Sequence, residues 1–166
     1  MAQQTINIGT IANDNTGDTL RGAGEKINDN FDELYAAVPL VTPSTWVPTL
    51  TDSGGGRTFA ITTNTARHTT IGCVTTFTAD ITVNSVTGSA TGNLRLSLPD
   101  AVTYEAAAAV WLTDGTSQAK TAIIARLIAG TSYLELSHFE TGAATSLAAN
   151  LQATSRLIVS GTYFTT

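Results

Sequence analysis

The stretch IGCVTTFTADITV, Ile71 to Val83, decides the fold. Its odd-numbered positions are apolar apart from Thr75, and its even-numbered positions from Thr76 onward carry only threonine and aspartate. Alternation of this kind, with a period of two residues, is typical of a β-strand that buries one face. The sequence therefore predicts a long, half-buried strand here, with Cys73 on its apolar face, where a free cysteine behaves as a small hydrophobe.

Shorter apolar runs continue this pattern to the C-terminus. Strands are predicted near residues 94–98, 110–112, 123–128, 134–136 and 157–163, and after the glycines of residues 54–56. Turn-forming residues separate them at 54–56, 85–92, 114–115, 129–130 and 141–142. Seven or eight strands within about 120 residues predict a mainly β protein whose strands form an antiparallel β-sandwich, jelly-roll-like in arrangement.

The N-terminal part follows a helical pattern instead. Asp18 or Thr19 is well placed to cap a helix that ends at Tyr35. Gly22 and Gly24 each cost such a helix about 1 kcal/mol relative to alanine. An apolar stripe runs along it, and its residues, with the tyrosine that follows, are the anchoring or interface residues that we predict: Leu20, Ala23, Ile27, Phe31, Leu34 and Tyr35.

This stripe needs a covering surface, because burying its large side chains returns about 1.5–3 kcal/mol each. Three partners meet the requirement: the β domain of the same chain, further copies of the helix, or a different protein. Residues 1–37 carry a net charge of −4 and residues 38–166 a net charge of −1. We divide the chain into an N-terminal helical segment (1–37), a Pro-rich linker (38–48) and a β domain (49–166).

Composition excludes several classes of protein. The chain has 166 residues, a net charge of −5 and 13% charged residues, so a surface that neutralises nucleic-acid phosphates is not expected. The longest apolar run, Ala106 to Leu112, is far shorter than the roughly 20 residues of a membrane helix. A single cysteine rules out an intramolecular disulfide framework. We expect neither nucleic-acid binding nor membrane insertion, and the N-terminus shows no signal peptide.

No motif predicts chemistry. His68 and His138 lie far apart and outside any metal-ligand spacing, and the acidic turn at residues 14–18 does not follow the EF-hand pattern. The glycines at 54–56 precede a strand and lack the lysine of a phosphate-binding loop. We therefore predict no catalytic, cofactor or metal residues and a protein that is not an enzyme. The alternative from another class is a small glycan depolymerase, since two carboxylates can meet in space without a sequence signature.

The segment INIGTIANDNTGDTLRGAGEKINDNFDELY, Ile6 to Tyr35, resembles an N-terminal motif of tail-fibre and other virion structural proteins of tailed bacteriophages. Two glycines, Gly22 and Gly24, stand where that family more often has better helix formers. The phrases ARHTTIGCVTTFTADITV, LRLSLP and RLIVSGTYFTT look like those of small phage fibre-tip or head-fibre domains. The positions that match the N-terminal motif are Asn13, Asp14, Gly17, Asp18, Leu20, Arg21, Lys26, Asn28, Asn30, Phe31, Glu33, Leu34 and Tyr35.

The resemblance implies a homotrimer of jelly-roll domains that is part of the virion. Its N-terminal segments would attach to tail, baseplate or capsid proteins, and its β domains would project toward a host surface glycan. Exposed loops at 85–92, 114–118 and 141–146 are the expected binding positions. We accordingly predict a short trimeric tail fibre without enzymatic activity. A capsid decoration or head-fibre protein is the structural alternative, because both need an anchor and a projecting domain.

Overall fold

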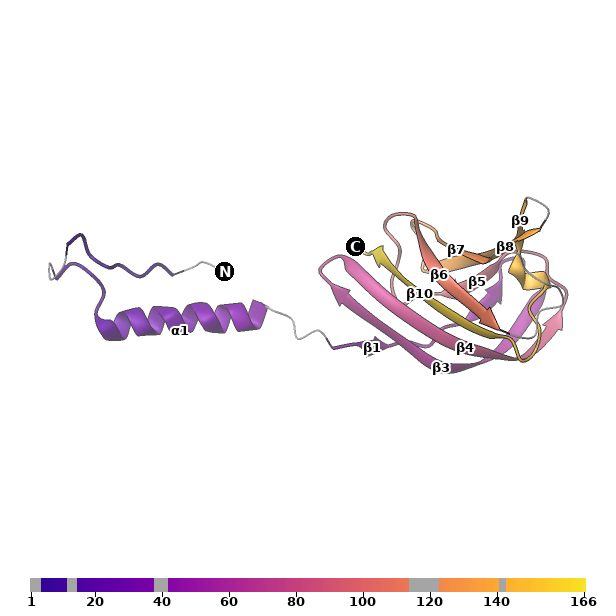
Figure 1. Cartoon of the computed structure of the whole chain (residues 1–166), viewed down its shortest axis with the longest axis horizontal. Helices are drawn as coiled ribbons and strands as arrows, with labels where there is room; N and C mark the ends of the chain where they lie inside the picture. Colours follow the sequence, from indigo (N-terminus) through magenta and orange to yellow (C-terminus); the bar gives the residue numbers. More distant parts are fainter. Residues whose placement is uncertain (1–3, 12–14, 38–41, 114–122, 141–142) are drawn as a thin grey trace. The chain divides into compact units, whose positions relative to one another are not determined.

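The computed structural model describes residues 4–11, 15–37, 42–113, 123–140 and 143–166. Contacts divide the chain into two compact units, Met1–Leu40 and Val41–Thr166 (Figure 1). The first unit contains one helix and the second contains the strands. A mainly β protein with a short N-terminal helix is therefore confirmed. Among the described residues, no helix combines the length and the apolar composition that crossing a membrane would require.

The helix α1 spans Leu20–Ala37 and begins where its capping residue predicts. Thr19 Oγ1 accepts a hydrogen bond from the backbone N–H of Gly22 at 3.1 Å, and the Thr19 carbonyl accepts from Ala23 at 2.8 Å. The threonine thus satisfies one of the N–H groups that have no partner within the first turn. Both the cap and the helix were predicted, and the helix ends two residues beyond Tyr35.

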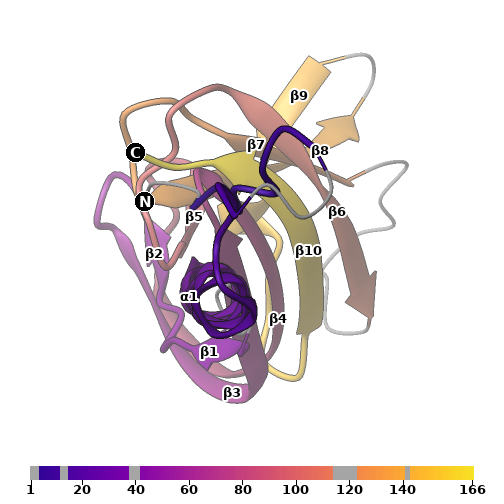
Figure 2. The ribbon, with the colours of Figure 1, turned by 90° about the vertical axis from the view of Figure 1, so that its left-hand side faces the viewer.

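Eight strands of the second unit form a closed ring in which every strand has two hydrogen-bonded neighbours. The order around the ring is β3-β2-β5-β8-β7-β6-β10-β4, and the pairing of β4 with β3 closes it. Figure 2 shows these strands arranged around a common interior. Their bounds are β2 Leu50–Asp52, β3 Arg57–Ile71, β4 Val74–Gly88, β5 Leu94–Ser97, β6 Ala106–Thr113, β7 Ile123–Leu127, β8 Tyr133–Glu140 and β10 Arg156–Phe164.

Two further strands lie beside the ring. β1 (Ser44–Thr45) pairs with β3, and β9 (Ala143–Ser146) pairs with β8. A short 3-10 helix, η1 (Leu147–Ala149), follows β9. β1 falls within the predicted linker of residues 38–48, whose first four residues lie outside the described part of the chain. The predicted domain boundaries stay predictions.

The closed barrel replaces the two-sheet sandwich that the sequence predicted. A sandwich leaves edge strands unpaired, whereas here the long hairpin of β3 and β4 joins both ends of the sheet. β3 pairs onward with β2, and β4 pairs onward with β10 over nine residues. Register shifts at Ala60/Ile61 and Thr63/Thr65 interrupt the hairpin, and bulges of this kind bend strands as closure needs.

The barrel interior is the core, and the alternation in β4 faces it as predicted. Phe77, Ala79, Ile81 and Val83 are at most 2% exposed. Tyr163 of β10 packs against Phe77 edge to face, with ring centroids 5.7 Å apart. Leucines from other strands fill the rest of the interior: Leu94, Leu96, Leu127, Leu134, Leu136 and Leu157.

The prediction of one strand over residues 71–83 is wrong for residues 71–73, because β3 ends at Ile71 and β4 begins at Val74. Gly72 has φ +60°, a left-handed conformation that suits glycine, and it forms the turn between β3 and β4. Ile71 is 54% exposed and Cys73 is exposed, so Cys73 does not lie on the buried face. Residues 85–88, predicted as a turn, belong to β4. The predicted turns at 114–115 and 141–142 lie outside the described residues.

Candidate functional site

The predicted anchoring residues all lie on α1, and their large side chains are exposed within their own unit. Ile27, Phe31 and Leu34 are 42–53% exposed, while Leu20 and Tyr35 are exposed further. Ala23, the small member of the stripe, is half-buried. The rings of Phe31 and Tyr35 stack with centroids 6.4 Å apart.

A shallow groove of about 260 Å³ lies on this part of the helix. Ile27, Asn30, Phe31 and Leu34 line it. Three of these four residues belong to the predicted stripe. The structure therefore brings the central part of the stripe together as a continuous apolar surface.

The segment before α1 folds back along the helix, and we call its described residues, 4–11 and 15–18, the strap. Gln4 and Asn30 exchange two hydrogen bonds. The backbone N–H of Gln4 donates to Asn30 Oδ1, and Asn30 Nδ2 donates to the Gln4 carbonyl, both at 2.9 Å. Lys26 Nζ donates to the carbonyl of Thr5 at 3.1 Å. Lys26 and Asn30 thus hold the beginning of the strap against the helix.

Asp18 fixes the other end of the strap. Its Oδ2 accepts from Lys26 Nζ at 2.7 Å and from the backbone N–H of Asn7 at 2.8 Å. The Lys26 hydrogen bond, followed by that of Asn7, lowers the pKa of Asp18. Gly17 permits this approach, because a Cβ there would lie 3.0 Å from the Asn7 carbonyl oxygen.

Sequence reasoning matched Asp18, Lys26 and Asn30 to a family motif but missed what they do. All three hold the strap, whereas the large side chains of the stripe remain exposed. The signal that was available is the i, i+4 spacing of Lys26 and Asn30, which places two polar side chains on one face beside the stripe.

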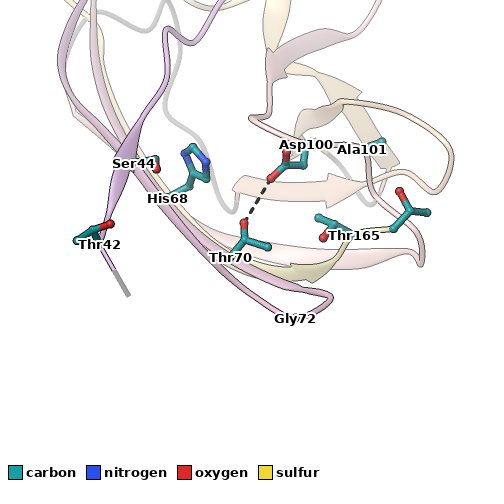
Figure 3. A pocket seen from close by; sticks show the side chains of 9 residues that line it. Thr42, Ser44, His68, Thr70, Gly72, Asp100, Ala101 and Thr165 are labelled. Carbon is teal, nitrogen blue, oxygen red and sulfur yellow. Dashed lines mark hydrogen bonds between the residues drawn. The ribbon is translucent and has the colours of Figure 1, made fainter. Parts of the chain in front are cut away.

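The barrel contains a polar pocket of about 440 Å³ beside the turn between β3 and β4. Figure 3 shows Ser44 of β1, His68 and Thr70 of β3, and Asp100 around this space. The C-terminus contributes as well, since the backbone N–H of Thr165 donates to the Cys73 carbonyl at 2.8 Å. The remaining lining residues are Thr42, Gly72, Ala101, Thr165 and Thr166.

Asp100 is the acidic residue of the pocket, and the core holds its backbone in place. The Tyr163 hydroxyl lies 3.3 Å from both the backbone N and the backbone O of Asp100. Burial of Tyr163 raises its pKa to about 12. The Asp100 carboxylate accepts longer hydrogen bonds through Oδ2, from Thr75 Oγ1 at 3.4 Å and from Thr70 Oγ1 at 3.5 Å.

The two histidines occupy different places. His68 lines the pocket, and its ring meets Trp46 edge to face at 5.8 Å. His138 is completely buried, with Nε2 3.3 Å from Asn150 Nδ2. Within the described ranges, no three His, Cys, Asp or Glu side chains gather as a metal ion would require. Asp100 is the only Asp or Glu side chain among the described residues that line the pocket.

The N-terminal part of the chain matches a family of phage proteins. Residues 3–42 match the family described as Bacteriophage T4 gp9/10-like protein, N-terminal. A stretch of 33 residues, 20% of this chain, is 64% identical to the baseplate wedge protein gp10 of Enterobacteria phage T4. The protein is a phage virion component. Its predicted location in the virion is thereby confirmed, although the chain spans only 6% of that relative's length.

Much of the chain is similar in structure to part of a solved tailspike protein. The crystal structure of the Dettilon tailspike protein (gp208) matches 75% of this chain with a TM-score of 0.61. The identity is 17%, and the match covers 24% of the tailspike chain. At this identity the likeness shows a shared fold.

Proposed function

We propose that the protein is a non-enzymatic structural component of a phage tail or baseplate. Its N-terminal unit attaches it to another virion protein, and its barrel projects toward the host surface. The observation that carries this proposal is the exposed stripe on α1, in which Ile27, Phe31 and Leu34 lack a covering surface within their unit. The stripe lies in residues 3–42, which match the T4 gp9/10-like N-terminal family, and 33 residues of the chain are similar to a baseplate wedge protein. Both likenesses favour the tail or baseplate over the capsid.

The energetics of the stripe support docking. Covering an apolar side chain of this size contributes about 1.5–3 kcal/mol. The described strap residues hydrogen-bond to polar side chains of α1, Lys26, Asp29 and Asn30. The large apolar side chains of the stripe stay exposed beside them. An isolated helix of this length is only marginally stable in water. Attachment therefore buries the stripe and stabilises α1 in one step.

We further propose that the protein is a short homotrimeric fibre. The low share of charged residues, 13%, suits packing of copies side by side, because few charges lose their hydration at such an interface. Apolar side chains remain on the outside of the barrel, including Trp111 of β6 and Ile124 of β7, which are 53% and 40% exposed. Light scattering of the purified chain should give three times 17.2 kDa, about 52 kDa. A monomer of about 17 kDa in both solution and particle would contradict the trimer.

Incorporation into particles tests the anchor. We expect the double variant Ile27→Ser, Leu34→Ser to be lost from purified particles, because serine removes the apolar contact area. The matched control is Glu25→Ser, Asp32→Ser, which changes two exposed polar residues of the same helix. The control should be incorporated at the wild-type level. Normal incorporation of the stripe variant would overturn the proposal.

A further inference from the structure

We propose that the barrel pocket lined by His68, Thr70 and Asp100 binds a neutral sugar residue of a host surface glycan. This inference rests on the proposed function only in that the barrel faces the host. It assigns the binding position to the barrel end beside the β3–β4 turn, rather than to the loops at 85–92, 114–118 and 141–146 that the sequence suggested.

The lining chemistry selects the ligand class. Hydroxyl side chains dominate the wall, and each hydroxyl can both donate and accept a hydrogen bond. Sugar hydroxyls have the same two-way capacity, so they match such a wall. No lysine or arginine is found among the lining residues, and Asp100 brings a negative charge, which disfavours an anionic ligand. The polar lining likewise disfavours an apolar ligand.

Two groups in the pocket have hydrogen-bonding capacity that the described residues leave unused. The Asp100 carboxylate is contacted through Oδ2 only, so Oδ1 is available to accept. His68 makes a ring contact with Trp46, and no described residue hydrogen-bonds to its ring nitrogens. Its Nδ1 is buried and out of a ligand's reach, so Nε2 is the ring nitrogen that a sugar hydroxyl can contact. Figure 3 shows His68 and Asp100 on two sides of the same space.

The pocket is also pre-organised. Tyr163 holds the Asp100 backbone, the pairing of Ser44 with His68 joins β1 to β3, and the Thr165–Cys73 hydrogen bond fixes the C-terminal wall. A ligand therefore does not have to order these walls when it binds. The volume, about 440 Å³, falls in the range of small-molecule sites, about 300–1,000 Å³.

Saturation-transfer NMR on the full chain tests this site directly. The probes are the methyl glycosides of glucose, galactose, mannose and N-acetylglucosamine at millimolar concentration, with glucosamine as a cationic comparison. We expect transfer to at least one neutral glycoside. Asp100→Asn should weaken its binding by about tenfold or more, because the amide oxygen accepts a weaker hydrogen bond than the charged carboxylate does. Thr70→Val should weaken it too.

Two matched controls separate the pocket from the rest of the barrel. Asp80→Asn makes the same chemical change on β4, where Asp80 pairs with Arg156 outside the pocket. Thr78→Val does the same for an exposed threonine of β4. Both should bind the glycoside as the wild type does. Thermal unfolding of every variant confirms folding, and if Asp100→Asn does not fold, Thr70→Val carries the comparison.

Three results would overturn the inference: no transfer from any neutral glycoside, binding that survives both pocket variants, or binding of glucosamine alone. These failures are distinguishable from failure of the proposed function. The anchor proposal predicts that Asp100→Asn enters particles normally, and it is tested by incorporation of the α1 variants without any sugar. Normal incorporation of the Ile27→Ser, Leu34→Ser variant would refute the anchor alone. Sugar binding that survives both pocket variants would refute the pocket alone.

Discussion

Replacing Tyr163 with phenylalanine removes one hydroxyl from the barrel and keeps the ring that packs on Phe77. Tyr163 is 2% exposed, and its hydroxyl lies 3.3 Å from the backbone N and O of Asp100. Each such hydrogen bond contributes about 0.5–1.5 kcal/mol. Both are long, and Asp100 is half-buried, so water replaces part of the loss. We expect the free energy of unfolding to fall by about 1 kcal/mol and Tm by about 4 °C.

The pH dependence gives this prediction a second, independent readout. Burial raises the pKa of Tyr163 from 10.0 to about 12, so the folded barrel holds this proton more tightly than the unfolded chain does. The resulting stabilisation is complete below pH 10 and is lost as the pH rises through 12. Tyr163→Phe has no such proton to lose. Its stability should therefore fall less steeply than that of the wild type between pH 10 and 12.

Tryptophan fluorescence during urea unfolding measures both effects, because Trp46 and Trp111 lie in the barrel unit and report on it alone. The remaining tyrosines titrate in both proteins, so their contributions cancel in the comparison. Equal stability at pH 7 would refute the hydrogen-bond argument. Parallel stability profiles between pH 10 and 12 would refute the burial argument.

Other substitutions test single contacts. Gly161→Ala should destabilise the barrel by several degrees in Tm, because the new Cβ would lie 2.9 Å from the Cβ of Ala108; an unchanged Tm would contradict that packing. Thr19→Ala should speed amide hydrogen exchange in the first turn of α1 by removing a cap worth about 0.5–2 kcal/mol. Gly24→Ala should slow exchange along α1, since nothing lies within 4 Å of the added methyl group. Asp80→Asn should flatten the acid limb of the stability profile. The Arg156 hydrogen bond lowers the pKa of Asp80, so its contribution is present above the ordinary pKa and is lost as the pH falls.

Strand positions were predictable because they follow a local period. From Phe77 to Val83, every second residue of β4 faces the core, and the sequence shows this directly. Closure of the sheet was not predictable in the same way. It depends on the pairing of β3 with both β2 and β4, and a strand with one buried face has the same alternation in a sandwich and in a barrel.

The hairpin turn at Gly72 shows how a local pattern misleads. Ile71 and Cys73 continue the apolar alternation, so the pattern extends the strand through the turn. The glycine between them has a positive φ and reverses the chain there. A glycine inside a strand pattern is consistent with a bulge, a close approach or a turn, and only the tertiary pairing of Ile71 with Val74 decides which.

The α1 stripe could be predicted from the sequence, whereas the barrel pocket could not. Helical periodicity places the α1 stripe, because it needs only residues three and four positions apart. The pocket depends on contacts between distant residues, such as Thr70 with Asp100 and Asp100 with Tyr163. No periodic or motif signal links those positions. Sequence reasoning therefore placed the stripe on the helix, where its anchoring role stays a prediction, and it missed the pocket.

A cryo-EM reconstruction of the intact particle at side-chain resolution tests the central claim most directly. Our account predicts that Phe31 and Leu34 contact apolar side chains of another polypeptide chain within about 4.5 Å. A reconstruction in which the same face of α1 is surrounded by solvent, while the protein remains attached through other residues, would contradict it.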